Sequence, residues 1–240
     1  MKIFLTSDAG GVIKNEDGYF PCRLDQSNQF ADRLKAALPE PADCLLISSD
    51  PDDDEMNDGY RYLMKEAFRL NGISLSNVTI CDRRNCSAMK SLVEAADLII
   101  LCGGHVPTQN RFFKDGGLAQ MLKSYDGVIV GISAGSMNSA SLVYAHPELD
   151  GEAADPAYER FLTGLGLTDI TILPHYQELA GATLDGLRLI EDIAIPDSCR
   201  HPFYALPDGS YVYIEDGNTE FCGSYYYFHD GTVEPHIQES

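Results

Sequence analysis

Short apolar segments alternate with segments of helical periodicity along most of the chain. Leu98–Cys102 and Val128–Ile132 are continuously apolar, as strands covered on both faces of a parallel sheet are. The same pattern predicts strands at Lys2–Thr6, Cys44–Ser49, Val78–Cys81 and Ile170–Leu173, and helices at Asn28–Leu38, Tyr60–Leu70, Ala88–Ala95 and Thr183–Ile193. The alternation predicts an α/β fold of three layers, with a mostly parallel sheet flanked by helices.

The last forty residues follow a different pattern, in which strand-like segments are separated by turn sequences. The segments are Phe203–Leu206, Tyr211–Glu215, Glu220–Phe228 and Val233–His236. They predict an antiparallel C-terminal flank on the parallel sheet. Because the chain contains no internal repeat, low-complexity tract or Pro/Ser-rich linker, we expect residues 1–240 to form a single domain.

Composition narrows the class of protein. The 240 residues are 44 % hydrophobic, enough for a sizeable core, yet no run of about 18 apolar residues could span a membrane. The first residues are too soon interrupted by Ser7 and Asp8 for a signal peptide. The seven cysteines form no CxxC pair, which argues against a disulfide framework and a cysteine-rich zinc site. We therefore expect reduced thiols and a cytoplasmic protein that needs no metal or cofactor.

The formal net charge of −20 repels nucleic acids and anionic membrane surfaces, so neither is an expected partner. The densest acidic run is Asp50–Glu55. An EF-hand loop that began at Asp50 would need Gly and Glu where Glu55 and Arg61 stand. We expect a solvated loop here, with an adventitious cation site as the alternative.

The segment with the clearest chemistry is 127–138, where an apolar strand leads directly into Gly-Ile-Ser133-Ala-Gly. G-x-S-x-G between a strand and a helix is the context of a nucleophile elbow, a tight turn that exposes the serine hydroxyl. The following N–H groups begin a helix and can stabilise an oxyanion. The alternative is an ordinary strand–turn–helix junction with Ser133 as its N-cap. Ser136, one helical turn further on, is a second hydroxyl with a packing role as the simpler interpretation.

A serine nucleophile needs a base, and six histidines are available. His175 follows a predicted strand, and strand carboxyl ends are where α/β sheets place their sites. His105 follows Gly103-Gly104 after another strand and also lies at that edge. The other four, His146, His201, His229 and His236, fall in loops and tail turns.

An acid must orient the base. Asp208 stands at a strand–turn boundary, with Glu148 and Asp150 as rivals, and spacing alone does not choose among them. Asp208 also fits a plain Pro-Asp-Gly turn. Gly103-Gly104 allows a close backbone approach to a ligand and could supply an oxyanion N–H, or it is an ordinary exit from the strand.

Four segments, taken in order, resemble the peptidase E family of serine dipeptidases, which is related to the cyanophycinases. They are Leu101-Cys-Gly-Gly104, Gly131-Ile-Ser-Ala-Gly-Ser136, Ile172-Leu-Pro-His175 and Ala205-Leu-Pro-Asp-Gly209, and they spread over more than half of the chain. The resemblance implies a flavodoxin-like fold similar to the class I glutamine amidotransferases, with serine in place of cysteine. It also implies the chain order serine, histidine, acid.

Carried over by position, the resemblance implies Ser133 as nucleophile, His175 as general base and the N–H groups of Gly104 and Ala134 as oxyanion hole. The family commonly has Pro-Glu-Gly where this chain has Pro207-Asp208-Gly209. An acid downstream of the serine has also been assigned in the family, and Glu148 is the nearest match, so both acids stay open.

The family acts on dipeptides, so the resemblance implies a small peptide substrate with a free N-terminus. Its basic residue for an aspartyl side chain falls near Asp185 or Arg188 in this sequence. We expect the polar loop from His105 to Asn110 to restrict the site and contact the substrate, with Arg111 and Arg188 as candidates for a basic group. An N-terminal aspartate is one candidate first residue.

Two other functions remain open at the level of sequence. One is an esterase or an amidase that acts on a non-peptide substrate, and the other is a non-catalytic binding protein on the same fold. The sequence leaves the oligomeric state open.

Overall fold

The fold is built on a central seven-stranded sheet with the strand order β15-β14-β1-β7-β6-β4-β5. The structure, a computed structural model, describes residues 1–238. Strands β1, β7, β6, β4 and β5 run parallel, whereas β14 and β15 are antiparallel to their neighbours. The seven strands are β1 (Lys2–Thr6), β4 (Ala42–Ile47), β5 (Leu75–Cys81), β6 (Leu98–Leu101), β7 (Val128–Ile132), β14 (Tyr211–Glu215) and β15 (Asn218–Cys222).

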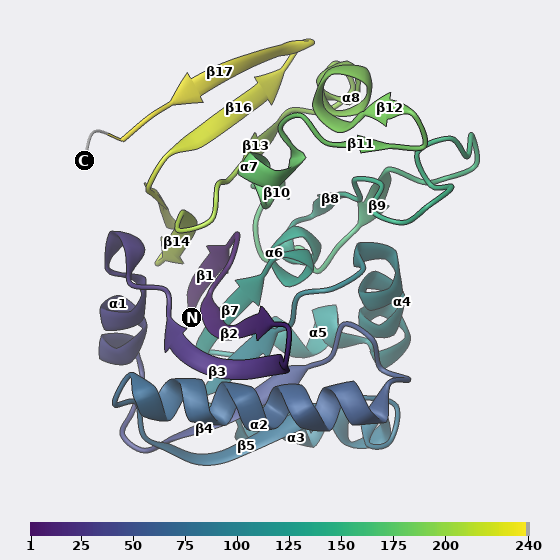
Figure 1. Cartoon of the computed structure of the whole chain (residues 1–240). Coiled ribbons are helices and arrows are strands. Elements are labelled where there is room, and N and C mark those ends of the chain that lie inside the picture. The colour runs from purple at the N-terminus through teal and green to yellow at the C-terminus, as the bar shows by residue number, and fades with distance from the viewer. Residues whose placement is uncertain (239–240) are drawn as a thin grey trace.

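Helices cover both faces of this sheet (Figure 1). They are α1 (Phe30–Ala37), α2 (Asp54–Leu70), α3 (Met89–Ala95), α4 (Val106–Gly116), α5 (Leu118–Leu122) and α6 (Ala134–Ser139). Helices α7 (Tyr176–Leu179) and α8 (Ile195–Ser198) instead pack with the C-terminal strands. Within residues 1–238, no helix is long and apolar enough to cross a membrane.

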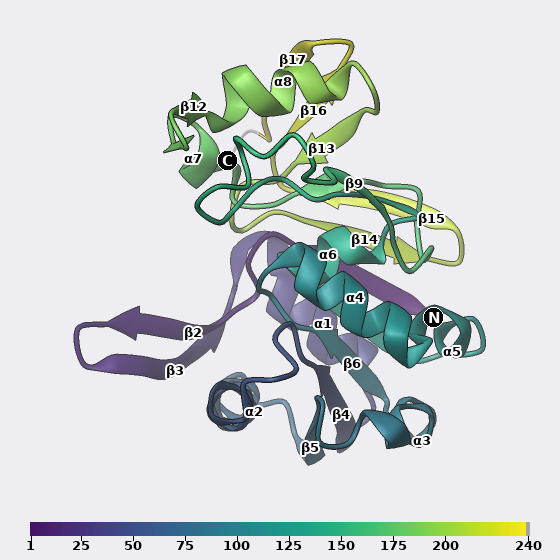
Figure 2. The same ribbon diagram turned by 90° about the vertical axis from the view of Figure 1, so that its right-hand side faces the viewer.

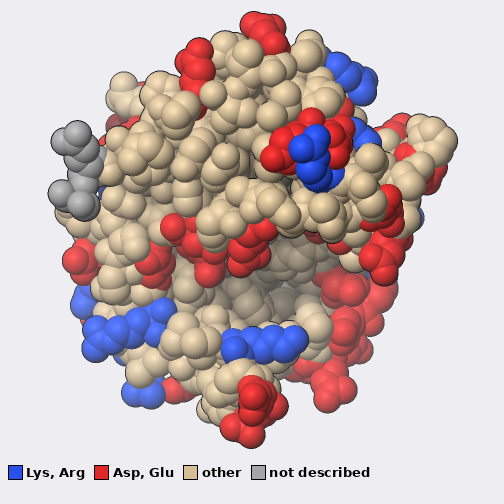
Figure 3. All heavy atoms as spheres, turned by 45° about the horizontal axis from the view of Figure 1, so that its top comes forward, with Lys and Arg blue, Asp and Glu red and all other residues tan. Residues whose placement is uncertain are grey.

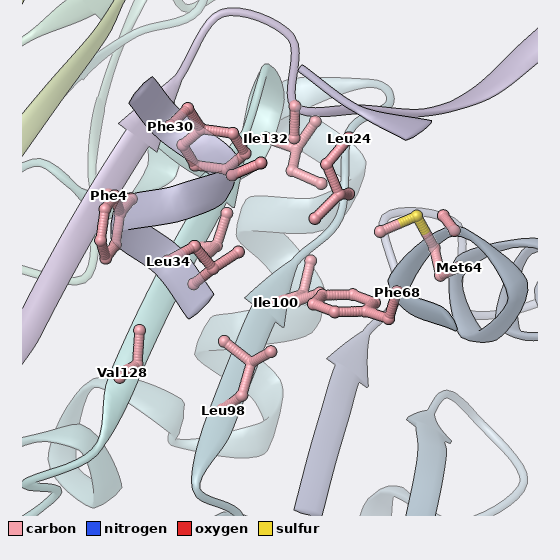
Figure 4. Packing of buried hydrophobic residues seen from close by; sticks show 14 of the residues in the cluster. Phe4, Leu24, Phe30, Leu34, Met64, Phe68, Leu98, Ile100, Val128 and Ile132 are labelled. Carbon is pink, nitrogen blue, oxygen red and sulfur yellow. The ribbon is translucent and has the colours of Figure 1, made fainter. Parts of the chain in front are cut away.

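The continuously apolar strands contribute side chains to the cores on both faces of the sheet, because successive side chains of a strand point to opposite faces. In β1, Phe4 packs in the core on the α1 and α2 side, whereas Ile3 and Leu5 pack in the core on the α3, α4 and α5 side. Leu98 and Ile100 of β6 lie in the first core with Phe68 of α2 (Figure 4). Because apolar side chains alternate between the two faces, the sheet packs against helices on both sides, which gives three layers.

A second sheet of four strands lies beyond the carboxyl ends of the central parallel strands (Figures 1 and 2). Its strand order is β10-β13-β16-β17. Its strands are β10 (Ile172–Leu173), β13 (Phe203–Ala205), β16 (Tyr225–His229) and β17 (Thr232–His236). Three strand pairs complete the fold: β2 (Gly10–Asn15) with β3 (Gly18–Leu24), β8 (Leu142–Tyr144) with β9 (Phe161–Thr163), and β11 (Thr183–Leu184) with β12 (Leu187–Arg188).

The predicted α/β architecture with a mostly parallel, helix-flanked sheet is confirmed. The antiparallel flank is present as β14 and β15, but β13, β16 and β17 belong to the second sheet. The predicted strand Glu220–Phe228 is two strands, because the chain turns at Gly223, where φ is +99°. The sequence analysis also missed the β2–β3 hairpin, which projects from the body in Figure 2.

The predicted helix at Thr183–Ile193 is wrong over its first half. Residues 183–188 form the β11–β12 hairpin around Asp185 and Gly186, which have φ of +54° and +81°. An Asp-Gly pair with both φ values positive is typical of a two-residue hairpin turn, and it outweighs the helical spacing of the apolar residues.

The acidic run Asp50–Glu55 is only partly the solvated loop that we expected. Asp53 caps α2 by accepting the Met56 N–H at 3.0 Å, and Asp54 and Glu55 form the first helical turn. Negative charge at a helix N-terminus is favourable, because it faces the positive end of the helix dipole. Asp52 pairs with Arg83 at 3.0 Å.

Helix α6 lies unusually close to the central sheet, because glycines stand at the contact. A Cβ atom on Gly135 would overlap the carbonyl group of Leu101, and one on Gly131 would lie 2.8 Å from the Cα atom of Ser136. The two glycines that frame Ser133 in the sequence are therefore required by packing.

We expect Gly135→Ala to lower the free energy of unfolding by about 1–3 kcal/mol, as overpacking of a close contact does. Gly59→Ala is the matched control. Gly59 lies in α2 with open space around its Cα, so the alanine should raise stability by about 0.5–1 kcal/mol. Urea denaturation of both variants measures the difference, and equal stabilities would contradict the packing argument.

Candidate active site

Ser133 occupies a strained turn between β7 and α6, with φ of 49° and ψ of −110°. Few residues other than glycine adopt such a conformation, and it persists only where the surroundings enforce it. Here the Ser133 N–H donates to the Thr6 carbonyl at 3.1 Å, and the Ser133 carbonyl accepts the Met137 N–H at 3.1 Å. The turn sets the hydroxyl at the carboxyl end of the central sheet.

His175 approaches from the second sheet, directly after β10. Its Nε2 lies 3.0 Å from Ser133 Oγ. The residue has φ of +55°, and its N–H donates to Ser7 Oγ at 2.7 Å, so the start of α7 is tied to the end of β1. The structure thus joins the serine and the histidine selected from the sequence, although 42 residues separate them.

Asp208 lies between β13 and β14 and completes the chain of contacts. Its Oδ1 is 2.8 Å from His175 Nδ1 and accepts the Ser7 hydroxyl at 2.6 Å, while Oδ2 accepts the Gln177 side-chain amide at 2.5 Å. An ionised carboxylate only accepts hydrogen bonds, so Nδ1 of His175 carries the proton. Nε2 is then free to accept the Ser133 hydroxyl hydrogen.

These contacts explain the protonation of the pair. Burial acts to raise the pKa of Asp208, but the hydrogen bonds from His175, Ser7 and Gln177 outweigh it and hold the pKa below its ordinary value. Burial acts to lower the pKa of His175, but the hydrogen bond and charge of Asp208 outweigh it, so this pKa is raised. Glu178 and Asp8 raise it further by their charges.

Ser7 and Gln177 were not selected from the sequence. The only available signal was position: Ser7 directly follows the first parallel strand, and Gln177 lies two residues after His175. Polar residues at the carboxyl ends of parallel strands share one edge of the sheet, but the sequence does not show which of them meet.

The two backbone N–H groups expected to form an oxyanion hole, those of Gly104 and Ala134, belong to segments next to Ser133. Gly103 is close to Ser133, since a Cβ built on it would lie 3.4 Å from the Ser133 Cβ. The Gly103 carbonyl accepts the Ser49 hydroxyl at 2.6 Å. Because the peptide is trans, the following Gly104 N–H points away from Ser49. The Ala134 N–H belongs to the first residue of α6, where no intrahelical acceptor exists.

Gly104 has φ of +152°, and a side chain there would clash with Ser49. Both features require glycine. The turn 103–105, between β6 and α4, therefore has a conformation that no other residue type fits.

Ser136 is fully buried, and its hydroxyl donates to the Thr6 carbonyl at 2.8 Å. It supports the turn and is not exposed to a ligand. His146 is also buried, with Nε2 3.3 Å from the Leu189 carbonyl. His229 pairs with Glu234 on the surface of the second sheet.

Glu148, the alternative acid, does not contact Nδ1 of His175, where Asp208 lies instead. Its side chain is exposed, yet the surrounding protein displaces enough water, together with the Glu152 charge, to raise the pKa of Glu148 to about 7. The His175 charge opposes this shift, which places the two groups within electrostatic range.

The two predicted substrate contacts of the segment 105–110, His105 and Asn110, both bond to other residues of the protein. The segment from His105 to Asn110 is the start of α4 and not a loop. Asn110 is 4 % exposed and donates to Asn138 Oδ1 at 2.9 Å and to the Thr163 carbonyl at 3.0 Å. The expectation that Asn110 contacts substrate is therefore wrong, because its amide is used inside the protein. His105 bonds to Glu152 at 2.8 Å.

The predicted basic groups are on the surface. Arg111 is exposed on α4. The Arg188 guanidinium pairs with Asp192 at 2.7 Å, and the Asp185 carboxylate accepts the Gly151 and Ala153 N–H groups at 2.9 and 3.0 Å.

Acidic side chains border a recess on the face shown in Figure 3. Within residues 1–238, no three His, Cys, Asp or Glu side chains are grouped as a metal site requires.

Comparisons with solved structures agree with this fold. The chain is similar to a peptidase from an acI-B1 Actinobacterium, with 13 % identity, a TM-score of 0.66, and coverage of 100 % of this chain and 95 % of the other. A protein described as peptidase E from Listeria monocytogenes EGD-e has 14 % identity and a TM-score of 0.60, with coverage of 92 % and 96 %. At these identities the likeness shows the fold alone.

No curated protein sequence matches the chain. The family model of Peptidase family S51 matches residues 51–222, which is well over half of the chain and includes Ser133, His175 and Asp208. This chain therefore belongs to peptidase family S51 and is a serine-type peptidase.

Proposed function

We propose that this peptidase hydrolyses dipeptides and other short peptides with a free N-terminus, through an acyl-enzyme on Ser133. The observation that carries the proposal is the continuous line of contacts from Ser133 Oγ to His175 Nε2, at 3.0 Å, and from His175 Nδ1 to Asp208, at 2.8 Å. A serine, an imidazole and a carboxylate in this order are sufficient for acyl transfer.

In the proposed reaction, Ser133 Oγ attacks the scissile carbonyl while His175 Nε2 accepts the hydroxyl proton. The Gly104 and Ala134 N–H groups stabilise the oxyanion that forms. The protonated His175 then gives its proton to the leaving amine as the C–N bond breaks. Water, deprotonated by His175, attacks the Ser133 ester, releases the acid product and restores the serine. Asp208 holds the Nδ1–H tautomer and stabilises the imidazolium throughout.

The charges around the site support a cationic amine as the recognised feature of the substrate. Asp8 and Glu178 act on His175, and Glu148 lies within electrostatic range of it. In a dipeptide the α-ammonium is separated from the scissile carbonyl by one carbon atom, so it would share this acidic environment. We propose that Glu148 attracts the ammonium group.

The same charges argue against a preference for an N-terminal aspartate. Arg188 is paired with Asp192, and Asp185 is engaged with backbone N–H groups. An aspartyl side chain would meet these acidic neighbours, and Arg188 is not free to pair with it. We therefore propose that a neutral first residue is preferred.

Ser133→Ala should reduce kcat by about 10⁶, because removal of the nucleophile of such a unit leaves only binding and oxyanion stabilisation. Ser136→Ala, in the same motif, is the matched control. It should keep kcat within about threefold and lose about 1 kcal/mol of stability with the buried hydrogen bond to Thr6. Dipeptide hydrolysis and fluorophosphonate labelling measure both variants. More than a tenth of wild-type turnover in Ser133→Ala would exclude Ser133.

Asp208→Asn should lower kcat by about 10³–10⁴, because the amide favours the wrong tautomer of His175. It should also move the acid limb of the kcat/KM profile to lower pH. The Asp208 charge raises the pKa of His175, so without that charge the imidazole deprotonates at lower pH. Glu148→Gln should instead raise KM and leave kcat within about tenfold. If the two variants exchanged these effects, Glu148 would be the orienting acid.

The substrate class is tested by kcat/KM for Ala-Leu, Asp-Leu, N-acetyl-Ala-Leu and a ten-residue peptide. We expect Ala-Leu to be best, Asp-Leu to be at least tenfold worse, and acetylation to abolish most of the activity by removing the ammonium charge. Efficient cleavage of the acetylated or long peptide would refute the small-substrate proposal. A preference for Asp-Leu would refute only the neutral first residue, and ester hydrolysis without peptide hydrolysis would favour an esterase.

A further inference from the structure

The His105 side chain, next to Gly104, is held from two sides. Its Nε2 lies 2.8 Å from Glu152 Oε1, and its Nδ1 lies 2.8 Å from Thr108 Oγ1. The carboxylate only accepts, so Nε2 carries the proton and the Thr108 hydroxyl donates to Nδ1. Both ring nitrogens are satisfied, and the imidazole has one defined orientation.

Glu152 has a second set of partners. Its Oε2 accepts the N–H groups of Glu148 and Leu149 at 2.9 and 3.0 Å. The side chain is only 16 % exposed. Burial acts to raise the pKa of Glu152, but these backbone bonds and His105 outweigh it, so the pKa is lowered and the carboxylate stays ionised. One partly buried carboxylate thus joins the 103–105 turn to the loop that carries Glu148.

Gln109 holds both ends of the turn, since its N–H donates to the His105 carbonyl at 3.1 Å and its side-chain amide to the Cys102 carbonyl at 2.6 Å. The two glycines between these ends have fewer contacts. Gly103 and Gly104 have no side chains, and the bond from Ser49 holds only the Gly103 carbonyl. Glycine peptides have more conformational freedom than others, so the Gly104 N–H could rotate out of line. His105 is the first residue after them with a side chain. It precedes the first residue of α4, yet it makes no side-chain cap bond to that helix.

We propose that Glu152 is a positioning residue, which acts through His105 to hold the Gly104 N–H in the direction where the oxyanion forms. The inference rests on the proposed hydrolysis through Ser133. A contact that orients an oxyanion donor acts on the transition state, so its loss lowers kcat and leaves KM nearly unchanged. A merely structural contact would lower stability without this split.

The test compares Glu152→Ala, His105→Ala and the double variant with the wild type. We expect each single variant to lower kcat by about 10–100-fold, the range for partners that orient a functional group. KM should change less than threefold in His105→Ala. In Glu152→Ala it should rise no more than in Glu148→Gln, because Glu152 also holds the Glu148 N–H. Because both changes remove the same His105–Glu152 contact, its loss should be counted only once, and the kcat of the double variant should be close to that of the poorer single variant. Multiplying losses, or an unchanged kcat in Glu152→Ala, would overturn the proposal.

Asp185→Ala is the matched control, because Asp185 holds the same loop from its other side through Gly151 and Ala153 without contacting His105. It should lower the free energy of unfolding and keep kcat within about threefold. A loss of kcat as large as that in Glu152→Ala would assign the effect to loop stability and overturn the proposal. Glu152→Gln covers the case that the alanine variant does not fold. Its amide oxygen can accept the two backbone N–H groups, but its amide N–H can donate to His105 Nε2 only if the imidazole takes the other tautomer, with Nδ1–H donating to Thr108. The contact is then neutral and weaker, so kcat should fall between wild type and His105→Ala, and a kcat as low as that of His105→Ala in a folded variant that keeps both contacts would count against the proposal.

The rate of fluorophosphonate labelling of Ser133 separates this inference from the proposed function, since attack on phosphorus also builds negative charge on an oxygen in the oxyanion hole. No labelling of the wild type would mean that the serine mechanism fails. Wild-type labelling with an equal rate in Glu152→Ala would mean that only the positioning role fails. We expect labelling to slow by about the same factor as kcat.

Discussion

The Asp208 carboxylate connects the two sheets of this protein at the candidate active site. It accepts hydrogen bonds from Ser7 at the end of β1, and from His175 and Gln177 after β10. The Ser7 hydroxyl also accepts the His175 N–H, so it is both donor and acceptor between the sheets. Hydrogen bonds to a charged group are about twice as strong as neutral ones, which suits a contact that must hold two separate elements in register.

This arrangement explains why a half-exposed pair can keep a fixed geometry. The side chains of His175 and Asp208 are 32 % and 33 % exposed, so their mutual attraction alone would be weakened by solvent. Additional donors to Asp208 and the backbone bond to Ser7 reduce the number of alternative rotamers. The turn of Ser133 is fixed separately, by Thr6 and by the close packing of α6. Each member of the line is therefore positioned by neighbours from another segment.

Local signals predicted the layers of the fold and selected Ser133 and His175, whose side chains the structure brings together. The apolar runs of β6 and β7 and the glycines around Ser133 are readable from a few neighbouring positions. His175 could be selected because it ends a strand. The acid could not, since Asp208 and Glu148 differ only in where the chain brings them. Asn110 was misjudged because its segment was read as a loop, although Pro107 at the second position of a helix is a recognised start signal. Hydrogen bonds across 168 or more residues, such as those of Ser7, leave no local pattern.

The unfavourable conformational energy of this site lies in its backbone. Ser133, His175 and Gly104 all have positive φ. Thr6 holds Ser133 and Ser7 holds His175, while Ser49 binds the Gly103 carbonyl, one residue before Gly104. Thr6 and Ser7 end β1, whereas Ser49 follows β4. These strands lie in the parallel sheet, whose register is fixed by the packing of both its faces. The packed core thus fixes the directions of Ser133, His175 and the 103–105 turn. This dependence explains why the site stands at the carboxyl edge of the sheet and not in a freely moving loop.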